Sequence, residues 1–140
     1  MLNGHVKWGT IQGSHSNALS ALDVWLRGLR TENADVLGAC ERFIEDRSKA
    51  KTAQPIVQQV IGMVTMLFAR YDFPLVYQSP GDAKRIASRA LLKRADLWTT
   101  AAEVGCPDAN DINDAMRHAV LASARYRAQA FEKIFTAGNG

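Results

Sequence analysis

The chain has 140 residues, 47% of them hydrophobic and 22% charged, a composition that predicts one ordinary globular domain over residues 1–140. It lacks both an apolar run of the ~20 residues needed to cross a bilayer and a basic-then-apolar N-terminus. We therefore expect a cytoplasmic protein with no membrane span and no signal peptide. The formal net charge of +3 permits nucleic-acid binding without requiring it. Cys40 and Cys106 show no CxxC spacing, and Cys40 is interpreted as a small core residue.

The first third of the chain predicts a strand, a helix and a second strand. Residues 5–12 alternate in the manner of a half-buried strand. Leucines then recur at helical spacing, which predicts an amphipathic helix that ends near Thr31. Residues 35–43 contain a short apolar run, interpreted as a buried strand that carries the carboxylate of Glu41 at its end.

The middle of the chain predicts a helix, a strand and a basic segment. Residues 52–70 are apolar around most of the helix that they predict, so we expect this helix to be buried against a sheet. Residues 73–78 predict another short strand, which the sequence Ser79-Pro-Gly-Asp closes as a turn. Residues 84–98 mix basic and apolar side chains in a helix or turn, where the cations face either phosphates or plain solvent.

Residues from about 110 onward predict the last and longest helix, with core-facing side chains that continue through Tyr126 to Ala130. This alternation of strands and helices favours an α/β fold in which helices cover a sheet. The sequence contains no GxGxxG, GxxxxGK or nucleophile-elbow motif and no zinc-ligand spacing. The commonest nucleotide-binding and hydrolase classes are therefore excluded.

Acidic residues are concentrated at the start of that last helix. Because side chains three and four positions apart lie over one another, Asp111, Asp114 and His118 should form one polar row. Such acids also occur in ordinary helices, where Asn110 or Asp111 caps the first turn. Together with Glu41 on a distant strand, however, they have the chemistry of a divalent-metal site made of oxygen ligands.

Five segments in order along the chain are similar to the bacteriophage branch of RuvC-type Holliday-junction resolvases. The similarity runs from about Val6 to Tyr126 and is carried by Ala39-Cys-Glu-Arg-Phe, Ile61-Gly-Met-Val, Tyr77-Gln-Ser-Pro-Gly-Asp-Ala-Lys, Leu91-Leu-Lys-Arg-Ala-Asp-Leu-Trp and Asn113-Asp-Ala-Met-Arg-His-Ala. The resemblance implies an RNase H-like mixed sheet flanked by helices, with a long C-terminal helix. It also implies cleavage of branched DNA with two Mg²⁺ or Mn²⁺ ions and no organic cofactor.

By matching positions, the resemblance assigns roles to four residues. Glu41 corresponds to the carboxylate of the central strand, Lys84 to the lysine after the last strand and Asp114 to the helical metal ligand. Asp111 stands where the family often has histidine, and it is chemically able to act as an oxygen ligand. Glu41, Asp111 and Asp114 are thus the expected metal ligands, while Lys84 stabilises charge on the phosphate or orients the attacking water.

The expected DNA partner implies a set of basic contacts and a homodimer. A four-way junction has two-fold symmetry, so two nicks need two sites and hence two copies of the chain. The residues predicted to contact DNA are Arg42, Arg47, Lys49, Lys51, Lys84, Arg85, Lys93, Arg94, Arg117 and His118.

The family's first strand, with an aspartate that bridges both ions, has no counterpart ahead of residues 5–12. We therefore expect either an N-terminally truncated nuclease domain or a RuvC-like protein that has lost its chemistry, and the three remaining acids favour truncation. Three hypotheses stay open: a metal-dependent endonuclease on branched DNA, a catalytically inactive DNA-binding or dimerising protein of that fold, and a small α/β interaction module.

Overall fold

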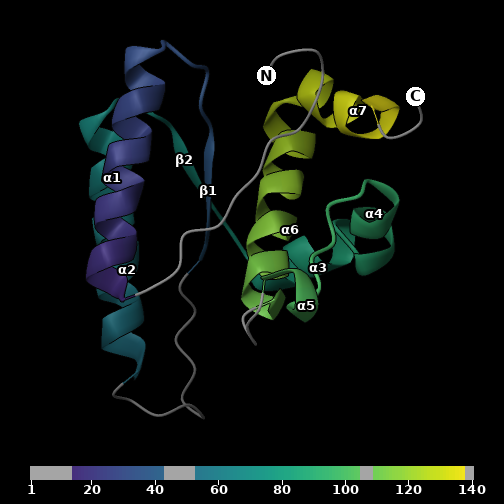
Figure 1. Cartoon of the computed structure of the whole chain (residues 1–140), viewed down its shortest axis with the longest axis horizontal. Helices are drawn as coiled ribbons and strands as arrows, with labels where there is room; N and C mark the ends of the chain where they lie inside the picture. Colours follow the sequence, from purple (N-terminus) through teal and green to yellow (C-terminus); the bar gives the residue numbers. More distant parts are fainter. Residues whose placement is uncertain (1–13, 43–52, 105–108, 138–140) are drawn as a thin grey trace. The chain divides into compact units, whose positions relative to one another are not determined.

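Seven helices and two short strands make up the part of the chain that the computed structural model describes, residues 14–42, 53–104 and 109–137 (Figure 1). The chain divides into two compact units. We call the described residues up to Val76 the N-terminal unit and those from Tyr77 the C-terminal unit, and each is described by itself. None of the helices among these residues is long and apolar enough to cross a membrane.

The N-terminal unit contains helix α1 (His15–Thr31), strand β1 (Gly38–Glu41), helix α2 (Ala53–Arg70) and the start of strand β2 (Leu75–Gln78). The two strands pair in parallel as a two-stranded sheet. The predicted helix up to Thr31 and the strand that ends at Glu41 are confirmed, and the mixed α/β class holds for a largely helical chain. The strand predicted for residues 5–12 lies outside the described residues.

The core of the N-terminal unit forms where the leucine face of α1 meets α2 and the strands. Leu26 of α1, Phe68 of α2 and Phe73 are buried together, and Val36, Val64 and Leu75 pack around them. Figure 1 shows α1 and α2 running side by side, in agreement with their contacts. Gly38 on β1 makes this packing tight, because the ring of Phe68 occupies the space that a side chain at this position would need.

Helix α2 is less buried than its composition predicts. Ile56 and Val57 in its first half are 49% and 47% exposed, and Met63 and Met66 are at least half exposed. Only one stripe, which includes Val64, Leu67 and Phe68, reaches the core. The sheet that the described residues form has two four-residue strands, so it is too narrow to cover a helix of 18 residues on several faces. The expectation that α2 is buried against a sheet therefore holds for this stripe alone.

The C-terminal unit is helical, with α3 (Pro80–Ile86), α4 (Arg89–Arg94), α5 (Ala101–Val104), α6 (Ala109–Tyr126) and α7 (Ala128–Ala137). Ser79-Pro-Gly-Asp, predicted to be a turn, instead begins α3. The hydroxyl of Ser79 accepts a hydrogen bond from the amide of Asp82, and Pro80 takes a first-turn position where its missing N–H costs nothing. Ser88 caps α4 in the same way, through the amide of Leu91.

The predicted single last helix is divided into α6 and α7 at Arg127. After this break the chain changes direction, as Figure 1 shows. Ile134 and Phe131 of α7 thereby pack against the cluster of Leu92 and Val120. Tyr126, expected on the core stripe, is 51% exposed at the end of α6. The division occurs because a straight helix would carry the apolar side chains of α7 past that cluster.

Helices α1, α2 and α4 end in the same way, with a residue in the left-handed region. Asn33, Asp72 and Asp96 have φ values of 55°, 59° and 58°. At each end two backbone bonds close the last turn; after α4 these run from Asp96 N to Lys93 O and from Leu97 N to Leu92 O. This is the Schellman pattern, in which glycine is the usual left-handed residue. Here Asn and Asp take that position, so each end carries some backbone strain.

Replacing Gly38 by alanine should destabilise the N-terminal unit. The new Cβ would lie 2.3 Å from Cε1 of Phe68 and 2.8 Å from Cδ1 of Leu75, so a core ring has to move. We expect the free energy of unfolding to fall by about 1–3 kcal/mol, measured by urea denaturation. The control is Gly62→Ala in α2, where a Cβ meets nothing within 4 Å. It should raise stability by roughly 0.5–1 kcal/mol, and equal effects of the two substitutions would contradict the described packing.

Candidate functional site

Two carboxylates of α6 lie near its N-terminal end. Asp111 is exposed in the first turn, and the side chain of Asp114 is 38% exposed one turn later. The predicted polar row is present for this pair, which shares one side of the helix by its spacing. The partner of Asp114 is Arg117, whose Nη1 donates to Oδ1 at 2.7 Å. The side chain of Arg117 is 15% exposed, so this is a partly buried ion pair.

Arg117 makes two further contacts within the C-terminal unit. Its Nε donates to the carbonyl oxygen of Ala87 at 3.2 Å, between α3 and α4. Its guanidinium carbon lies 5.5 Å from the ring centroid of Trp98. The sequence predicts Arg117 as a phosphate contact, but the structure uses the side chain to join α6 to neighbouring segments. With 15% of its side chain exposed, Arg117 has few N–H donors left that could contact a phosphate.

His118, the third member of the predicted row, is in the interior of the C-terminal unit, with 4% of its surface exposed. Gln78 is also buried, and its amide nitrogen donates to the carbonyl oxygen of His118 at 2.9 Å. The same nitrogen lies 3.4 Å from Nδ1 of the ring. His118 therefore packs against the end of β2, where its ring is shielded from solvent. A surface phosphate does not reach it in this arrangement.

The residue that sequence reasoning missed is Asn113. Its side chain is 1% exposed and makes two hydrogen bonds to the backbone of Thr99: Oδ1 accepts from the amide at 2.9 Å, and Nδ2 donates to the carbonyl at 2.8 Å. These bonds tie the segment after α4 to α6 and thereby hold Trp98, the next residue back. A signal was available, because asparagine is unfavourable inside a helix unless its side chain has another partner.

The other predicted acid, Glu41, is the last residue of β1 in the N-terminal unit, and it is exposed. Arg42 follows it and is exposed too, while Arg47, Lys49 and Lys51 lie outside the described residues. Within the described ranges, no three His, Cys, Asp or Glu side chains come together as a group that could hold a metal ion. The pair Asp111 and Asp114 supplies two accessible hard-oxygen donors, and Mg²⁺ often takes only one or two carboxylates beside water.

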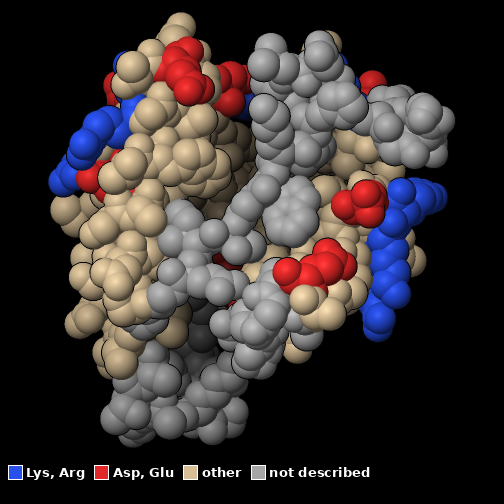
Figure 2. All heavy atoms as spheres, in the orientation of Figure 1, with Lys and Arg blue, Asp and Glu red and all other residues tan. Residues whose placement is uncertain are grey.

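Basic side chains are concentrated on α3 and α4. Lys84, Arg85, Lys93 and Arg94, all predicted DNA contacts, are exposed. Figure 2 shows Lys and Arg side chains gathered at the edge of the C-terminal unit where Figure 1 places α4. Arg85 pairs with Asp82 at 3.3 Å, so its charge is partly neutralised. The pKa of Asp82 is held below its usual value by hydrogen bonds from Arg125 and then from Arg85.

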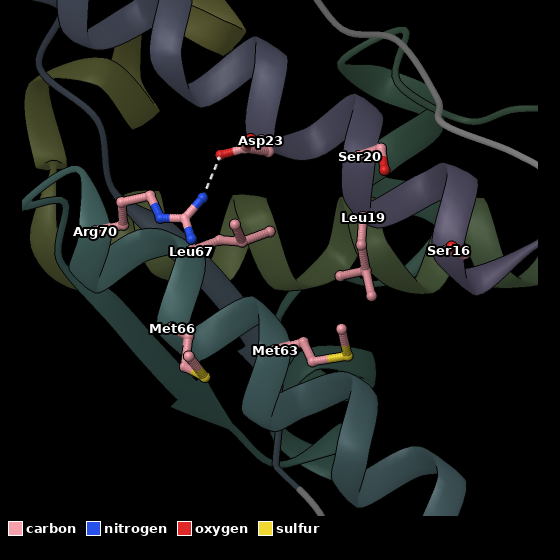
Figure 3. A pocket seen from close by; sticks show the side chains of 8 residues that line it. All are labelled: Ser16, Leu19, Ser20, Asp23, Met63, Met66, Leu67 and Arg70. Carbon is pink, nitrogen blue, oxygen red and sulfur yellow. Dashed lines mark hydrogen bonds and ion pairs between the residues drawn. The ribbon is translucent and has the colours of Figure 1, made fainter.

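The N-terminal unit has an open groove of about 300 Å³ between α1 and α2 (Figure 3). Leu19 and Met63 reach into it from opposite helices, and the ion pair of Asp23 and Arg70 lies at one end. Asp23 also accepts from Tyr71 and from Arg27. The carboxylate is therefore fully engaged in holding α1 to α2. We do not assign this groove to catalysis, because its only acid among the lining residues already has three partners.

Comparisons with protein-family models, with curated protein sequences and with solved structures give no match to this chain.

Loss of the Asn113 side chain should loosen the segment after α4. Asn113→Ala leaves the buried amide and carbonyl of Thr99 without partners, and each unsatisfied group costs about 1–3 kcal/mol. We expect the free energy of unfolding to fall by about 2–4 kcal/mol in urea denaturation. Asn110→Ala, at an exposed position of the same helix, is the matched control and should change stability by less than about 0.5 kcal/mol. Similar losses for both variants would show that the tie to Thr99 does not carry the effect.

Acid should weaken the contact between α1 and α2 at Asp23. The pKa of Asp23 lies below its ordinary value of 3.8, first because Tyr71 donates to the carboxylate and then because of the charges of Arg27 and Arg70. A carboxyl group whose pKa is lowered on folding contributes stability above its unfolded pKa, and this contribution is lost as the pH falls through the folded pKa. Urea midpoints of the wild type and Asp23→Asn should therefore differ most at neutral pH and converge near pH 2.

The control for this prediction is Asp72→Asn, which removes an exposed carboxylate and keeps a residue that tolerates the left-handed φ of 59°. It corrects for the general effect of net charge. A constant difference between wild type and Asp23→Asn from pH 7 to about pH 2 would contradict the role given to the charged form of Asp23.

Proposed function

We propose that this chain is a metal-dependent endodeoxyribonuclease of the RuvC type, with an RNase H-like fold, that cuts branched DNA such as Holliday junctions. The observation that carries the proposal is the accessible pair Asp111 and Asp114 at the start of α6, in the same unit as an exposed basic surface. Glu41 supports it, because it is exposed at the end of a parallel strand. The ordered sequence segments similar to RuvC-type resolvases supply the rest.

The proposed ligands of Mg²⁺ or Mn²⁺ on α6 are Asp111 and Asp114, and the resemblance alone adds Glu41 of the N-terminal unit. All three are hard-oxygen donors with solvent-accessible carboxylates, as such ions require. When bound, a pair of these ions activates water and neutralises charge on the scissile phosphate. Arg117 holds the carboxylate of Asp114 in one orientation through its bond at 2.7 Å, which limits the side-chain freedom lost on binding an ion.

Lys84 and the basic residues of α4 are assigned to the substrate. Lys84 is exposed in the last turn of α3, where its ammonium group can approach a phosphate. Lys93 and Arg94 provide further positive charge for the DNA backbone, which supplies most of the affinity of such complexes. We also propose a homodimer, because a junction with two-fold symmetry is cut at two equivalent strands.

One observation favours a second candidate, a protein of the same kind that binds branched DNA without cutting it. The ion pair with Arg117 satisfies the charge of Asp114 within the protein. An acid that is paired in this way has a structural role even where no metal binds. Under this alternative, DNA binding remains and hydrolysis is absent.

Cleavage of a labelled four-way junction with Mg²⁺ or Mn²⁺ tests the proposal. A version extended upstream by the strand and aspartate that the resemblance implies should cut, while Glu41→Gln and Asp111→Asn in that version should each lower the rate by at least about 100-fold, since each removes a charged ligand of the reacting centre. Both side chains are exposed, so these variants should fold. Glu32→Gln, at an exposed position after α1, is the matched control and should cut at the rate of the unsubstituted extended version.

Three outcomes distinguish the hypotheses. Cutting that depends on Glu41 and Asp111 but not on Glu32 supports the nuclease. Salt-dependent binding of junctions with no cutting in either ion supports the inactive DNA-binding protein. Neither binding nor cutting would leave a small α/β interaction module as the remaining hypothesis.

A further inference from the structure

Two arginines of α4 rest on aromatic rings. The guanidinium carbon of Arg89 lies 5.0 Å from the ring centroid of Trp98, and that of Arg94 lies 5.5 Å from the ring of Phe135. Both arginines are exposed. Within the described ranges, neither has a carboxylate within ion-pair distance. The rings therefore restrict the two guanidinium groups, and no carboxylate among the described residues neutralises their charge.

An arginine held on a ring differs from an ordinary surface arginine. A free side chain loses roughly 2 kcal/mol of rotamer entropy when it is immobilised by a ligand, and stacking on a ring has already restricted it. The N–H donors of a guanidinium group form a planar fork, which suits bidentate hydrogen bonding to a phosphate group.

The rings themselves are firmly positioned. Trp98 and Phe135 are partly buried and pack against the core cluster of Leu92, Val120 and Ile134. Trp98 is fixed further by Arg117, and the segment after it by the bonds between Asn113 and Thr99. The orientation of Arg89 is thus tied to the core of the C-terminal unit.

The charge pattern of this segment is also one-sided. Between residues 84 and 98 there are five basic residues and one acidic residue, Asp96, while the whole chain carries a net charge of only +3. A face that serves only solubility normally mixes both signs. Arg27, Arg70 and Arg125 pair with aspartates, whereas Arg89 and Arg94 lie over aromatic rings instead.

We propose that Arg89 on Trp98 and Arg94 on Phe135, together with Lys93, form a binding surface for the sugar–phosphate backbone of nucleic acid. We call these residues the α4 phosphate surface. The proposal rests on the proposed function and deepens it, because it names the groups that hold the DNA backbone, including Arg89 and Trp98, which the sequence did not single out. Recognition is of phosphate, so it requires neither a metal ion nor a particular base sequence.

Binding without metal separates this surface from the chemistry. The affinity of the protein for a labelled four-way junction is measured by fluorescence anisotropy in EDTA, at several salt concentrations between about 50 and 200 mM. We expect Arg89→Gln to weaken binding about fivefold at the lowest salt and to lower the slope of log affinity against log salt by about one. Arg30→Gln, at another exposed arginine near the end of α1, is the matched control and should behave like the wild type.

A second pair of variants tests the ring rather than the charge. Trp98→Leu keeps Arg89 but removes the aromatic ring beneath its guanidinium group. The affinity for the junction should fall two- to fivefold, which corresponds to roughly the free energy of one cation–π contact. The slope of log affinity against log salt should change little. Trp98→Phe should restore most of the loss. Thermal unfolding of each variant shows whether the fold is retained, and Arg89→Gln, at an exposed position, remains informative if Trp98→Leu unfolds.

Each outcome supports or overturns the inference. If the wild type binds and Arg89→Gln matches it in affinity and salt slope, the α4 phosphate surface is overturned, even if the protein cuts DNA. Binding that depends on Arg89 but never leads to cutting supports the surface and overturns the proposed nuclease. If the wild type binds no nucleic acid at the lowest salt, both proposals fail.

Discussion

Arg117 is the side chain on which the candidate surface of the C-terminal unit depends. It leaves the middle of α6 and meets three segments that are far from one another in sequence: Asp114 on its own helix, the carbonyl of Ala87 between α3 and α4, and the ring of Trp98 after α4. Since α3 and α4 are too short to be stable as isolated helices, their positions are set by contacts of this kind. Ala87 and Leu92, which are fully buried, provide the apolar part of the same anchoring.

The two units use their charges differently. In the N-terminal unit, the carboxylate of Asp23 accepts hydrogen bonds from Tyr71 and from two arginines. These bonds stabilise the contact between α1 and α2. In the C-terminal unit, Asp82 and Asp114 are paired with arginines, whereas the cations of α4 lie on rings or in solvent. Ion pairs between aspartates and arginines near the surface contribute modestly to the stability of the fold. The cations of α4 have no carboxylate partner among the described residues, so their charge is available to a ligand.

The sequence predicts local structure here better than it predicts burial. Hydrophobic spacing located α1 and α2 to within a residue or two, and the position of Glu41 at the end of a strand was correct. The break at Arg127 could not be predicted, because nothing in the local sequence requires it and only packing against the Leu92 cluster decides it. Ser79-Pro-Gly-Asp was misjudged because the same residues favour a turn and the capped start of a helix.

Helix-face reasoning predicts the exposure of a side chain correctly where that side chain stays on the surface and incorrectly where tertiary contacts bury it. Asp111 and Lys84 are exposed, as a helix-face argument expects. His118 and Arg117 have equally polar side chains, yet one is buried beside Gln78 and the other is shared among three segments. Spacing along a helix gives the direction of a side chain but not the identity of what packs over it. Asn113 was overlooked for the same reason, since its partner is the backbone of a loop.

The left-handed residues at three helix ends bear on how this chain can change over evolution. Asn33, Asp72 and Asp96 each hold a backbone conformation that costs an ordinary L-residue about 1 kcal/mol. Because Asn and Asp tolerate this conformation better than other residues with a Cβ, the cost at each helix end is smaller than that. Since glycine relieves this strain without altering the core, the chain has single-step routes to greater stability. Such steps would widen the stability margin within which the chain tolerates substitutions elsewhere, on α4 for example.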